Sequence, residues 1–530
     1  MPLPAAFVPL RHPAFRLLWC ATLVSNLGGW VQNTGAGWLM TSLDGRPLMV
    51  SLVQAASLLP VFLLALPAGA LADIVDRRRF LIGAQLWMSA VALTLCLLTA
   101  AGLVGAWGLL GLTFALAIGA AINFPAFAAV APELLPRQDL AQGIVLNGIG
   151  FNLARALGPA LGGLLIGVAG VQAAFALNAL CVLVLVVALF LWRREERDHP
   201  LPNEHFLSAI RAGLRYVRAS PVLRGTIARA MVAFFAGAAV WGLLPLLVRQ
   251  RLGLGPEAYG LMLAAMGAGA VGGGFLLPRM RQRFDNSSMV VLGSVALGVA
   301  LAVLGLSTHW LPAGLAMLAY GASWITVAST LSAAAQLSSP SWVRARSMGL
   351  FQVATFGAMA VGATLSGVLG GLIGIPAALT GFGVAGALGG WLLRRMPMEA
   401  MAAPAAGNGA AAALPEAPSP ELAPLLHQGS GQLMESVHYL IDPADRAAFL
   451  EVMREVRRVR QRSGAVAWRL AEDIAHPERF VEVWTMESWT DHLREGERLT
   501  PDDAAILSRA AAMHRAQGGP EAGRYLNVEP

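Results

Sequence analysis

The sequence predicts an all-α protein that crosses a membrane many times and carries a small α+β domain at its C-terminal end. Two observations support this fold class. Hydrophobic residues make up 56% of the 530 residues and charged residues only 13%, which is typical of polytopic membrane proteins. From residue 432 onward the composition changes, because 13 arginines and 17 acidic residues interrupt the apolar runs.

Twelve apolar segments are long enough to span a bilayer, which takes roughly 20 residues each. We expect spans at residues 14–40, 49–71, 80–101, 107–131, 143–168, 172–192, 225–248, 257–277, 288–307, 311–335, 347–371 and 375–393. The first segment is expected to stay in the chain as a span, since it is too long for a cleaved signal. Cys20, Cys96 and Cys181 lie within spans without metal-ligand spacing, so we expect packing roles and no metal site.

The distribution of arginines predicts the orientation. The chain has no lysine, and the even-numbered loops with both ends of the membrane region hold 20 arginines, whereas the odd-numbered loops hold three: Arg46, Arg249 and Arg251. Positive loops stay in the cytoplasm, so both termini are expected there. Topology and anionic lipid headgroups explain the basic balance, so the expected partners include the bilayer but no nucleic acid.

A basic run, GALADIVDRRRF from Gly69 to Phe80, lies between the second and third spans. It resembles the cytoplasmic loop between helices two and three of major facilitator superfamily transporters. Six positions fit that pattern: Gly69, Leu71, Asp73, Arg77, Arg78 and Arg79. Asp76 stands where the family usually has glycine, and Ile74 where it often has arginine. The resemblance implies a gate latch with Glu133 at the same rim, and the alternative is a tight basic loop held inside by its charge.

An internal repeat supports the same resemblance. LGPALGGLLIG, residues 157–167, overlays VGATLSGVLGG, residues 361–371, at an offset of 204 residues, and Leu277 stands in the place of Asp73. Two six-helix halves follow, at residues 1–192 and 223–396, as in the major facilitator fold, where the site lies between the halves. Residues 193–222 are expected to be a cytoplasmic central loop with an amphipathic helix. Small residues predict close helix packing at Gly158, Gly162, Gly163, Gly362 and Gly367.

Polar side chains inside spans are costly and need a partner, water or a function. The candidates for a substrate cavity are Asn26, Gln32, Asn33, Asn123, Asn147, Asn152, Arg155 and Gln352. Arg155 is the sharpest of these, because an unpaired arginine at the bilayer centre costs about 2.5–3.5 kcal/mol. We expect Arg155, with several of these amides, to line the cavity and hold an oxygen-rich or anionic ligand. For any single amide, interhelical hydrogen bonding is the favoured interpretation. Arg229, near the start of a span, is expected to extend to the interface.

The stretch from Asn123 to Gly163 resembles the branch of the superfamily that includes the enterobactin exporter and related secretion effectors. The resemblance implies export of small amphipathic compounds, siderophore-like or drug-like, from a bacterial inner membrane by alternating access. Coupling to protons also follows from the resemblance alone, because no Asp or Glu lies mid-span. The sequence shows no nucleotide-binding motif that would suggest primary transport.

Residues 397–431 are rich in Ala, Pro and Gly and predict a flexible linker. Residues 432–530 predict a soluble cytoplasmic domain with strands at 437–441, 466–470, 480–486 and 524–528, and helices beginning near residues 442, 488 and 500. This order suits a ferredoxin-like sandwich. The pattern resembles the dimeric barrel domains related to antibiotic-biosynthesis monooxygenases.

The C-terminal domain leaves two functions open. His438, His492, Trp468, Trp484 and Trp489 could form an oxygenase pocket, so that a fused enzyme modifies the exported compound. We favour a regulatory or dimerising domain without enzymatic activity or cofactor, because a sheet of this size needs an aromatic core. Self-association is expected, since tryptophans on an open sheet face would need a cover.

Overall fold

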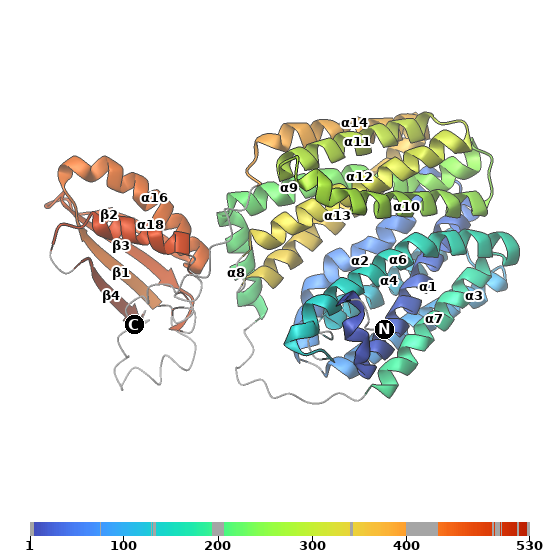
Figure 1. Cartoon of the computed structure of the whole chain (residues 1–530), viewed down its shortest axis with the longest axis horizontal. Helices are drawn as coiled ribbons and strands as arrows, with labels where there is room; N and C mark the ends of the chain where they lie inside the picture. The colour runs from blue at the N-terminus through green and yellow to red at the C-terminus, as the bar shows by residue number, and fades with distance from the viewer. Residues whose placement is uncertain are drawn as a thin grey trace. The chain divides into compact units, whose positions relative to one another are not determined.

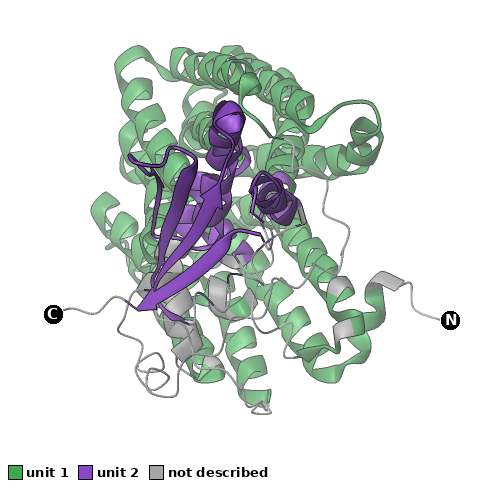
Figure 2. Cartoon of the chain, turned by 90° about the vertical axis from the view of Figure 1, so that its left-hand side faces the viewer, with its two compact units in different colours: residues 1–203, 225–333, 351–398 green, residues 204–224, 334–350, 399–530 purple. Residues whose placement is uncertain are grey.

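The computed structural model describes residues 5–74, 76–128, 130, 134–192, 206–339, 343–398, 433–489, 492, 495, 499, 501–516 and 519–526. The chain forms two compact units (Figure 2). The first comprises residues 1–203, 225–333 and 351–398, and the second comprises residues 204–224, 334–350 and 399–530. The long apolar helices build the first unit, and the C-terminal sheet belongs to the second.

Six long helices form the N-terminal half of the first unit (Figure 1): α1 (Pro13–Leu43), α2 (Pro47–Ile74), α3 (Arg77–Ala100), α4 (Ala106–Ala128), α6 (Arg137–Ala169) and α7 (Val171–Leu191). Each of the first six predicted spans overlaps one of them. The match follows from the apolar length that a bilayer requires, which the sequence shows directly.

Six more long helices follow: α9 (Pro221–Leu246), α10 (Pro256–Arg281), α11 (Asn286–Leu306), α12 (Trp310–Leu337), α13 (Arg344–Ile373) and α14 (Ile375–Leu392). Among the described helices, eleven are long and apolar enough to cross a membrane. The helix outside this set is α1, which has 31 residues but carries Asn26, Gln32 and Asn33 among its apolar positions. The predicted set of twelve long helices is therefore present.

The two halves repeat a backbone feature at the offset found in the sequence. Gly170 joins α6 to α7 with φ at 82°, and Gly374, 204 residues later, joins α13 to α14 with φ at 87°. Glycine adopts this left-handed conformation without the steric cost that a Cβ would bring. Both halves thus turn from their fifth to their sixth helix in a single glycine residue.

Arg229, on α9, is 1% exposed, so the expectation that it extends to the membrane interface is wrong. Its guanidinium donates hydrogen bonds to the carbonyl oxygens of Leu393 (3.0 Å), Arg394 (2.8 Å) and Met396 (2.7 Å) and to the Ser287 hydroxyl (2.9 Å). The carbonyls at the end of a helix have no partner within the helix. Arg229 satisfies those that follow α14, and this bonding holds the end of the membrane region in place.

The amphipathic helix expected in the central loop is α8 (Phe206–Ala219). Most side chains of its predicted apolar stripe lie outside the described residues. Within the second unit, the buried Tyr216 donates a hydrogen bond to the carbonyl oxygen of Ser338, 2.7 Å away, just beyond the end of α12. This contact packs α8 against the segment that connects α12 to α13.

The C-terminal domain contains four strands and two well-described helices: β1 (Leu433–Leu440), α16 (Arg446–Ser463), β2 (Ala467–Glu472), β3 (Arg479–Met486), α18 (Pro501–Ala512) and β4 (Glu521–Leu526). The sheet order is β2-β3-β1-β4, and all neighbours are antiparallel. This is the strand order of a ferredoxin-like sandwich, so that prediction is confirmed. The helix expected near residue 488 lies mostly outside the described residues.

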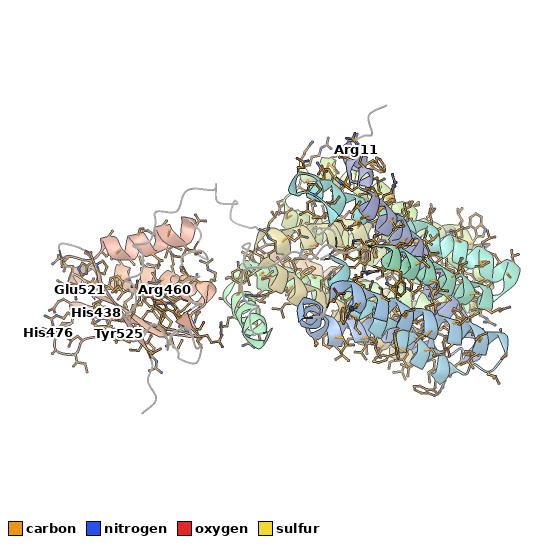
Figure 3. The ribbon with its side chains drawn as sticks, turned by 90° about the horizontal axis from the view of Figure 1, so that it is seen from below. Arg11, His438, Arg460, His476, Glu521 and Tyr525 are labelled. Carbon is orange, nitrogen blue, oxygen red and sulfur yellow. The ribbon has the colours of Figure 1, made fainter. Side chains whose placement is uncertain are left out.

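The tryptophans of this sheet do not lie on its open face, which corrects the reason given for self-association. Trp484 pairs with Trp468 across β2 and β3 and is 3% exposed, on the face covered by the helices. Phe449 and Val456 of α16 pack on the same face. The opposite face instead carries Met434 and Tyr525, which pair across β1 and β4 and are 39% and 50% exposed. Tyr525 is labelled in Figure 3.

Candidate substrate site

A cavity of about 320 Å³ lies inside the N-terminal half. The described residues that line it come from α1, α2, α3, α4, α6 and α7. Four of the predicted cavity residues are among them: Asn26, Gln32, Asn33 and Asn123. The wall adds further polar side chains from α1, α2, α3, α4 and α7: Thr22, Ser25, Ser57, Gln85, Thr113 and Asn178. The cavity therefore gathers amides and hydroxyls that are distant in sequence.

Two hydrogen bonds order the amides in this wall. Gln85 Nε2 donates to Asn123 Oδ1 and Asn178 Nδ2 donates to Gln32 Oε1, each over 3.0 Å. Three other polar atoms of the wall are buried without a hydrogen-bond partner among the described residues: Gln32 Nε2, Gln85 Oε1 and Thr113 Oγ1. Leaving a buried polar group unpaired costs about 1–3 kcal/mol. The cavity therefore has unused hydrogen-bonding capacity.

An aromatic region lies between the two halves, next to this cavity. Trp30 of α1 lines the cavity and also packs against Trp241 of α9, with ring centroids 5.9 Å apart. Phe151 of α6 lies at 6.3 Å from Trp30, edge to face. On α12, Tyr320 stacks on Trp324 at 5.8 Å. Rings from α1, α6, α9 and α12 thus meet at the boundary between the halves.

Arg155, on α6, belongs to this inter-half region and does not line the cavity. It is half-buried, it makes no hydrogen bond or ion pair with any described residue, and its guanidinium is in electrostatic range of Tyr320 on the opposite half. The other predicted residues lie apart. Asn152 is exposed and bonds the carbonyl of Gly148 in its own helix at 2.8 Å, while Asn147 on α6 and Gln352 on α13 are half-buried outside the cavity.

The sequence-based prediction did not include six polar residues that line the cavity: Thr22, Ser25, Ser57, Gln85, Thr113 and Asn178. Gln85 and Asn178 could have been predicted, because each is an amide inside an apolar span, which is the criterion that selected the predicted amides. Thr113 could not have been predicted in this way, since hydroxyls commonly bond the backbone carbonyl one turn earlier, and only its position among the other helices shows that it faces the cavity.

The glycines expected to permit close packing all lie where another helix approaches. A Cβ on Gly162 would lie 3.2 Å from Val31 Cα of α1, and one on Gly367 would lie 2.8 Å from the Pro47 carbonyl oxygen of α2. Gly158 similarly approaches Trp30, and Gly362 approaches the backbone of Phe235. Gly163 approaches the backbone of Gly260, so α6 of one half and α10 of the other meet without side chains between them.

The halves also bond to each other at the end that carries the odd-numbered loops. Arg249, just after α9, donates to the Thr41 hydroxyl of α1 at 2.9 Å and lies 5.7 Å from the Trp38 ring. Trp38 in turn stacks on Tyr259 of α10 at 6.0 Å. One of the three arginines in odd-numbered loops thus joins the two halves.

Part of the predicted latch is visible. Arg78 donates to the carbonyl oxygens of Leu189 (2.9 Å) and Phe190 (2.7 Å) at the end of α7. Asp76, the departure from the family pattern, caps α3 by accepting a hydrogen bond from the exposed Arg79 N–H at 2.8 Å. The surroundings of Gly69, the side chains of Asp73 and Arg77, and residue Glu133 lie outside the described part of the chain.

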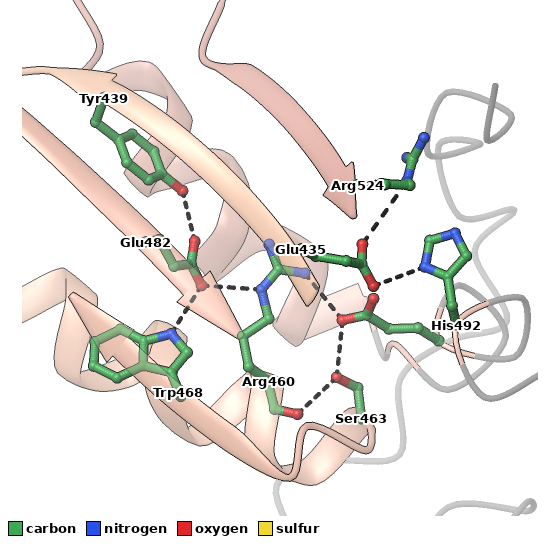
Figure 4. A network of polar contacts seen from close by, with 9 residues as sticks. Glu435, Tyr439, Arg460, Ser463, Trp468, Glu482, His492 and Arg524 are labelled. Carbon is green, nitrogen blue, oxygen red and sulfur yellow. Dashed lines mark hydrogen bonds and ion pairs between the residues drawn. The ribbon is translucent and has the colours of Figure 1, made fainter. Parts of the chain in front are cut away.

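The C-terminal domain contains a separate buried polar network (Figure 4). Glu482 is 0% exposed and accepts hydrogen bonds from Tyr439 (3.1 Å), Trp468 (2.9 Å) and Arg460 (3.1 Å). Arg460 also donates to Glu495 at 3.0 Å. Three donors thus compensate the charge of Glu482, as a buried carboxylate requires.

Glu435, His492 and Glu495 form the other side of this network. His492 Nδ1 is 2.7 Å from Glu435 Oε1, and the ligand atoms of the three residues lie within 4.8 Å of one another. Burial raises the pKa of Glu495; the charge of Arg460 opposes this rise, and the charge of Glu435 adds to it. His438, in contrast, lies on the outer sheet face opposite Glu521 (Figure 3).

Comparisons with known proteins agree with this architecture. The chain matches the family described as transmembrane secretion effector over residues 4–530. The uncharacterized MFS-type transporter YfiS of Bacillus subtilis is 27% identical over 49% of this chain, which covers 64% of YfiS, less than two thirds of its length. The enterobactin exporter EntS of Escherichia coli O1:K1 is 24% identical over 70% of this chain and 89% of the exporter.

Solved structures show the same fold at lower identity. A bacterial homologue of the human lysosomal transporter Spinster, inward-facing and occupied, superposes with a TM-score of 0.62 at 15% identity and covers 75% of this chain and 99% of its own. The POT family transporter PepTSo gives a TM-score of 0.60 at 13% identity and covers 72% of this chain and 97% of its own. With a family match along nearly the whole sequence, this chain belongs to the transmembrane secretion effector family of major facilitator superfamily transporters.

Proposed function

We propose that this transporter exports small amphipathic organic compounds, siderophore-like or drug-like, across a bacterial inner membrane, with both termini in the cytoplasm. The observation that carries the proposal is Arg155 of the N-terminal half, which is half-buried, lies within electrostatic range of Tyr320 of the C-terminal half and has no hydrogen-bond or ion-pair partner among the described residues. Similarity to an enterobactin exporter supports the outward direction.

The two parts of the site suit two parts of an amphipathic molecule. Arg155 offers a planar set of donors that matches oxygen-rich or anionic groups. The partly buried rings of Trp30, Trp241 and Trp324 offer apolar faces of the kind that bind organic ligands and cations. The amides of the adjoining cavity extend this surface into the N-terminal half.

Alternating access is supported by contacts between the halves at the odd-loop end, including Arg249 with Thr41 and Gly163 with Gly260. With cytoplasmic termini this end faces the periplasm, so the structure corresponds to a state closed on that side. Opening there requires these contacts to part while the latch around Asp73 closes the opposite end. Proton coupling would rely on acidic residues at the cytoplasmic rim, Asp73 and Glu133.

A comparison of culture media tests the export proposal. A strain that lacks the gene is compared with its parent and with strains that restore the wild-type protein or its Arg155→Ala variant. We expect at least one amphipathic compound to leave the medium and accumulate in cells of the deletion strain, with recovery only by the wild-type protein. Identical medium and cell contents in all four strains would refute the proposal.

The second candidate function is a fused enzyme, in which the C-terminal domain modifies the compound before export. One observation favours it: Glu435, His492 and Glu495 are buried together and could ligate a metal ion. Metal analysis of the purified full-length protein, with Glu435→Gln as the comparison, tests it. Stoichiometric metal that the variant loses would support catalysis, whereas no bound metal in either protein would leave these residues a structural network.

A further inference from the structure

The cavity inside the N-terminal half differs in chemistry from the region around Arg155. Its described wall contains no charged side chain, and all of its described lining residues belong to the six helices of one half. It is thus distinct from the path between the halves, although Trp30 and Phe151 line the cavity and face that path.

The free hydrogen-bonding atoms of the wall define what could bind. Gln32 and Gln85 are 4% and 1% exposed, and each uses one end of its amide to hold a neighbour, Asn178 and Asn123 respectively. Within the described part of the chain the other ends have no partner, a donor at Gln32 Nε2 and an acceptor at Gln85 Oε1, and neither has the Thr113 hydroxyl. A ligand that satisfies them must itself carry an acceptor and a donor.

The absence of charge among the described lining residues selects against ions. A carboxylate in the cavity would find donors but no cation, and an ammonium group would find acceptors but no carboxylate, so either would lose its hydration without a counter-charge. Transfer of an uncharged group out of water costs far less free energy. Neutral amides and hydroxyls in the wall therefore favour a neutral partner.

The dimensions suit a compact organic group. The volume of about 320 Å³ lies at the lower end of ligand pockets, which span roughly 300–1,000 Å³. It equals about ten waters at roughly 30 Å³ each. Aromatic walls at Trp30 and Phe151 and apolar walls at Leu116 and Val182 would cover the carbon skeleton of such a group.

We propose that this cavity is a binding subsite for an uncharged moiety that carries both a hydrogen-bond donor and an acceptor, as a carboxamide does. The proposal rests on the proposed export function, because it assigns this moiety to part of the exported compound. It adds a selectivity that the Arg155 region lacks: the substrate places a neutral polar group in the N-terminal half and its anionic or oxygen-rich group near Arg155.

Three probes of nearly equal shape test it on the full-length protein in nanodiscs. Benzamide is neutral with a donor and an acceptor, benzoate is anionic, and benzylammonium is cationic. Binding is titrated by saturation-transfer NMR. We expect benzamide to bind at least tenfold more tightly than either ion, and Gln85→Leu and Thr113→Val each to weaken benzamide binding about tenfold. Thr113→Val keeps the shape of the side chain, so it remains informative should Gln85→Leu fold poorly.

Gln172→Leu is the matched control, because Gln172 is an exposed amide on α7 that does not line the cavity. Its benzamide affinity should equal that of the wild type. Equal affinity for all three probes, or benzamide binding unchanged in both cavity variants, would overturn the proposal and leave water as the occupant. If benzamide binding is not selective but efflux is normal, the subsite is rejected and the export function stands. If benzamide binding is selective but no compound is exported, the export function is rejected and the subsite stands.

Discussion

Replacing Gly163 by alanine should open the contact between the two halves at the odd-loop end. An added Cβ would lie 2.6 Å from the Pro256 carbonyl oxygen and 2.7 Å from Gly260 Cα. Ordinary van der Waals contact begins at 3.4 Å, so these two distances are about 0.8 and 0.7 Å too short. The neighbouring atoms are backbone, which cannot change rotamer. The helices α6 and α10 must therefore move apart.

The cost falls on one state of the transport cycle. Overpacking of this kind costs about 1–3 kcal/mol, and the contact exists only while this end is closed. The equilibrium between closed and open states should therefore shift about 5–150-fold toward opening. Pulsed EPR between labels at Leu103 and Leu311, both exposed near odd-numbered loops of different halves, measures this shift as a larger population at long distance.

Gly148→Ala provides the control on the same helix, because its added Cβ would meet nothing within 4 Å. We expect its distance distribution and its transport rate to match those of the wild type. If Gly163→Ala gives the same distance distribution as Gly148→Ala, the close approach of α6 and α10 does not set the equilibrium between closed and open states. The proposed role of this contact in alternating access is then refuted.

Four further outcomes are expected. Arg155→Ala should lower affinity for the exported compound more than Arg155→Lys, since lysine keeps the charge but loses the planar fork; equal binding by wild type and the alanine variant would make the role structural. Asp73→Asn should slow transport while expression and insertion stay normal, and unchanged transport would remove the latch. The raised pKa of Glu495 means that the folded C-terminal domain binds this proton more tightly than the unfolded chain, whose value is near 4.5. Its stability contribution is therefore full below that pH and declines as pH rises through the folded value. Glu495→Gln should flatten the decline in thermal melts, and an unaltered pH profile would contradict the assignment. Residues 433–530 expressed alone should be soluble, self-associate and bind neither haem nor flavin, which sedimentation and absorbance would show; a monomer or a bound chromophore would count against this.

The sequence was sufficient for the spans because their length is set by the bilayer, and for the strand order because alternation and turns follow local rules. The sequence could not show which face of the sheet, or which side of each helix, is buried. Trp468 and Trp484 alternate as predicted, yet alternation alone does not say which sheet face the helices cover. Helices that are apolar on all sides likewise have no amphipathic pattern that would show which side faces the bundle interior. For this reason Thr113 was missed, and Asn152 was selected although it bonds its own helix.

A comparison of two intramembrane arginines explains why one is structural and the other is a candidate for function. Burying a guanidinium is costly unless its donors are satisfied. Arg229 meets this condition within the protein through three backbone carbonyls and the Ser287 hydroxyl, so nothing further need bind it. Arg155 makes no such bond to any described residue and faces the boundary between the halves. Its unused donors are therefore available to a molecule that enters between the halves. Gln32 and Gln85 in the neighbouring cavity are candidates for the same reason, because each has a buried polar atom without a partner among the described residues.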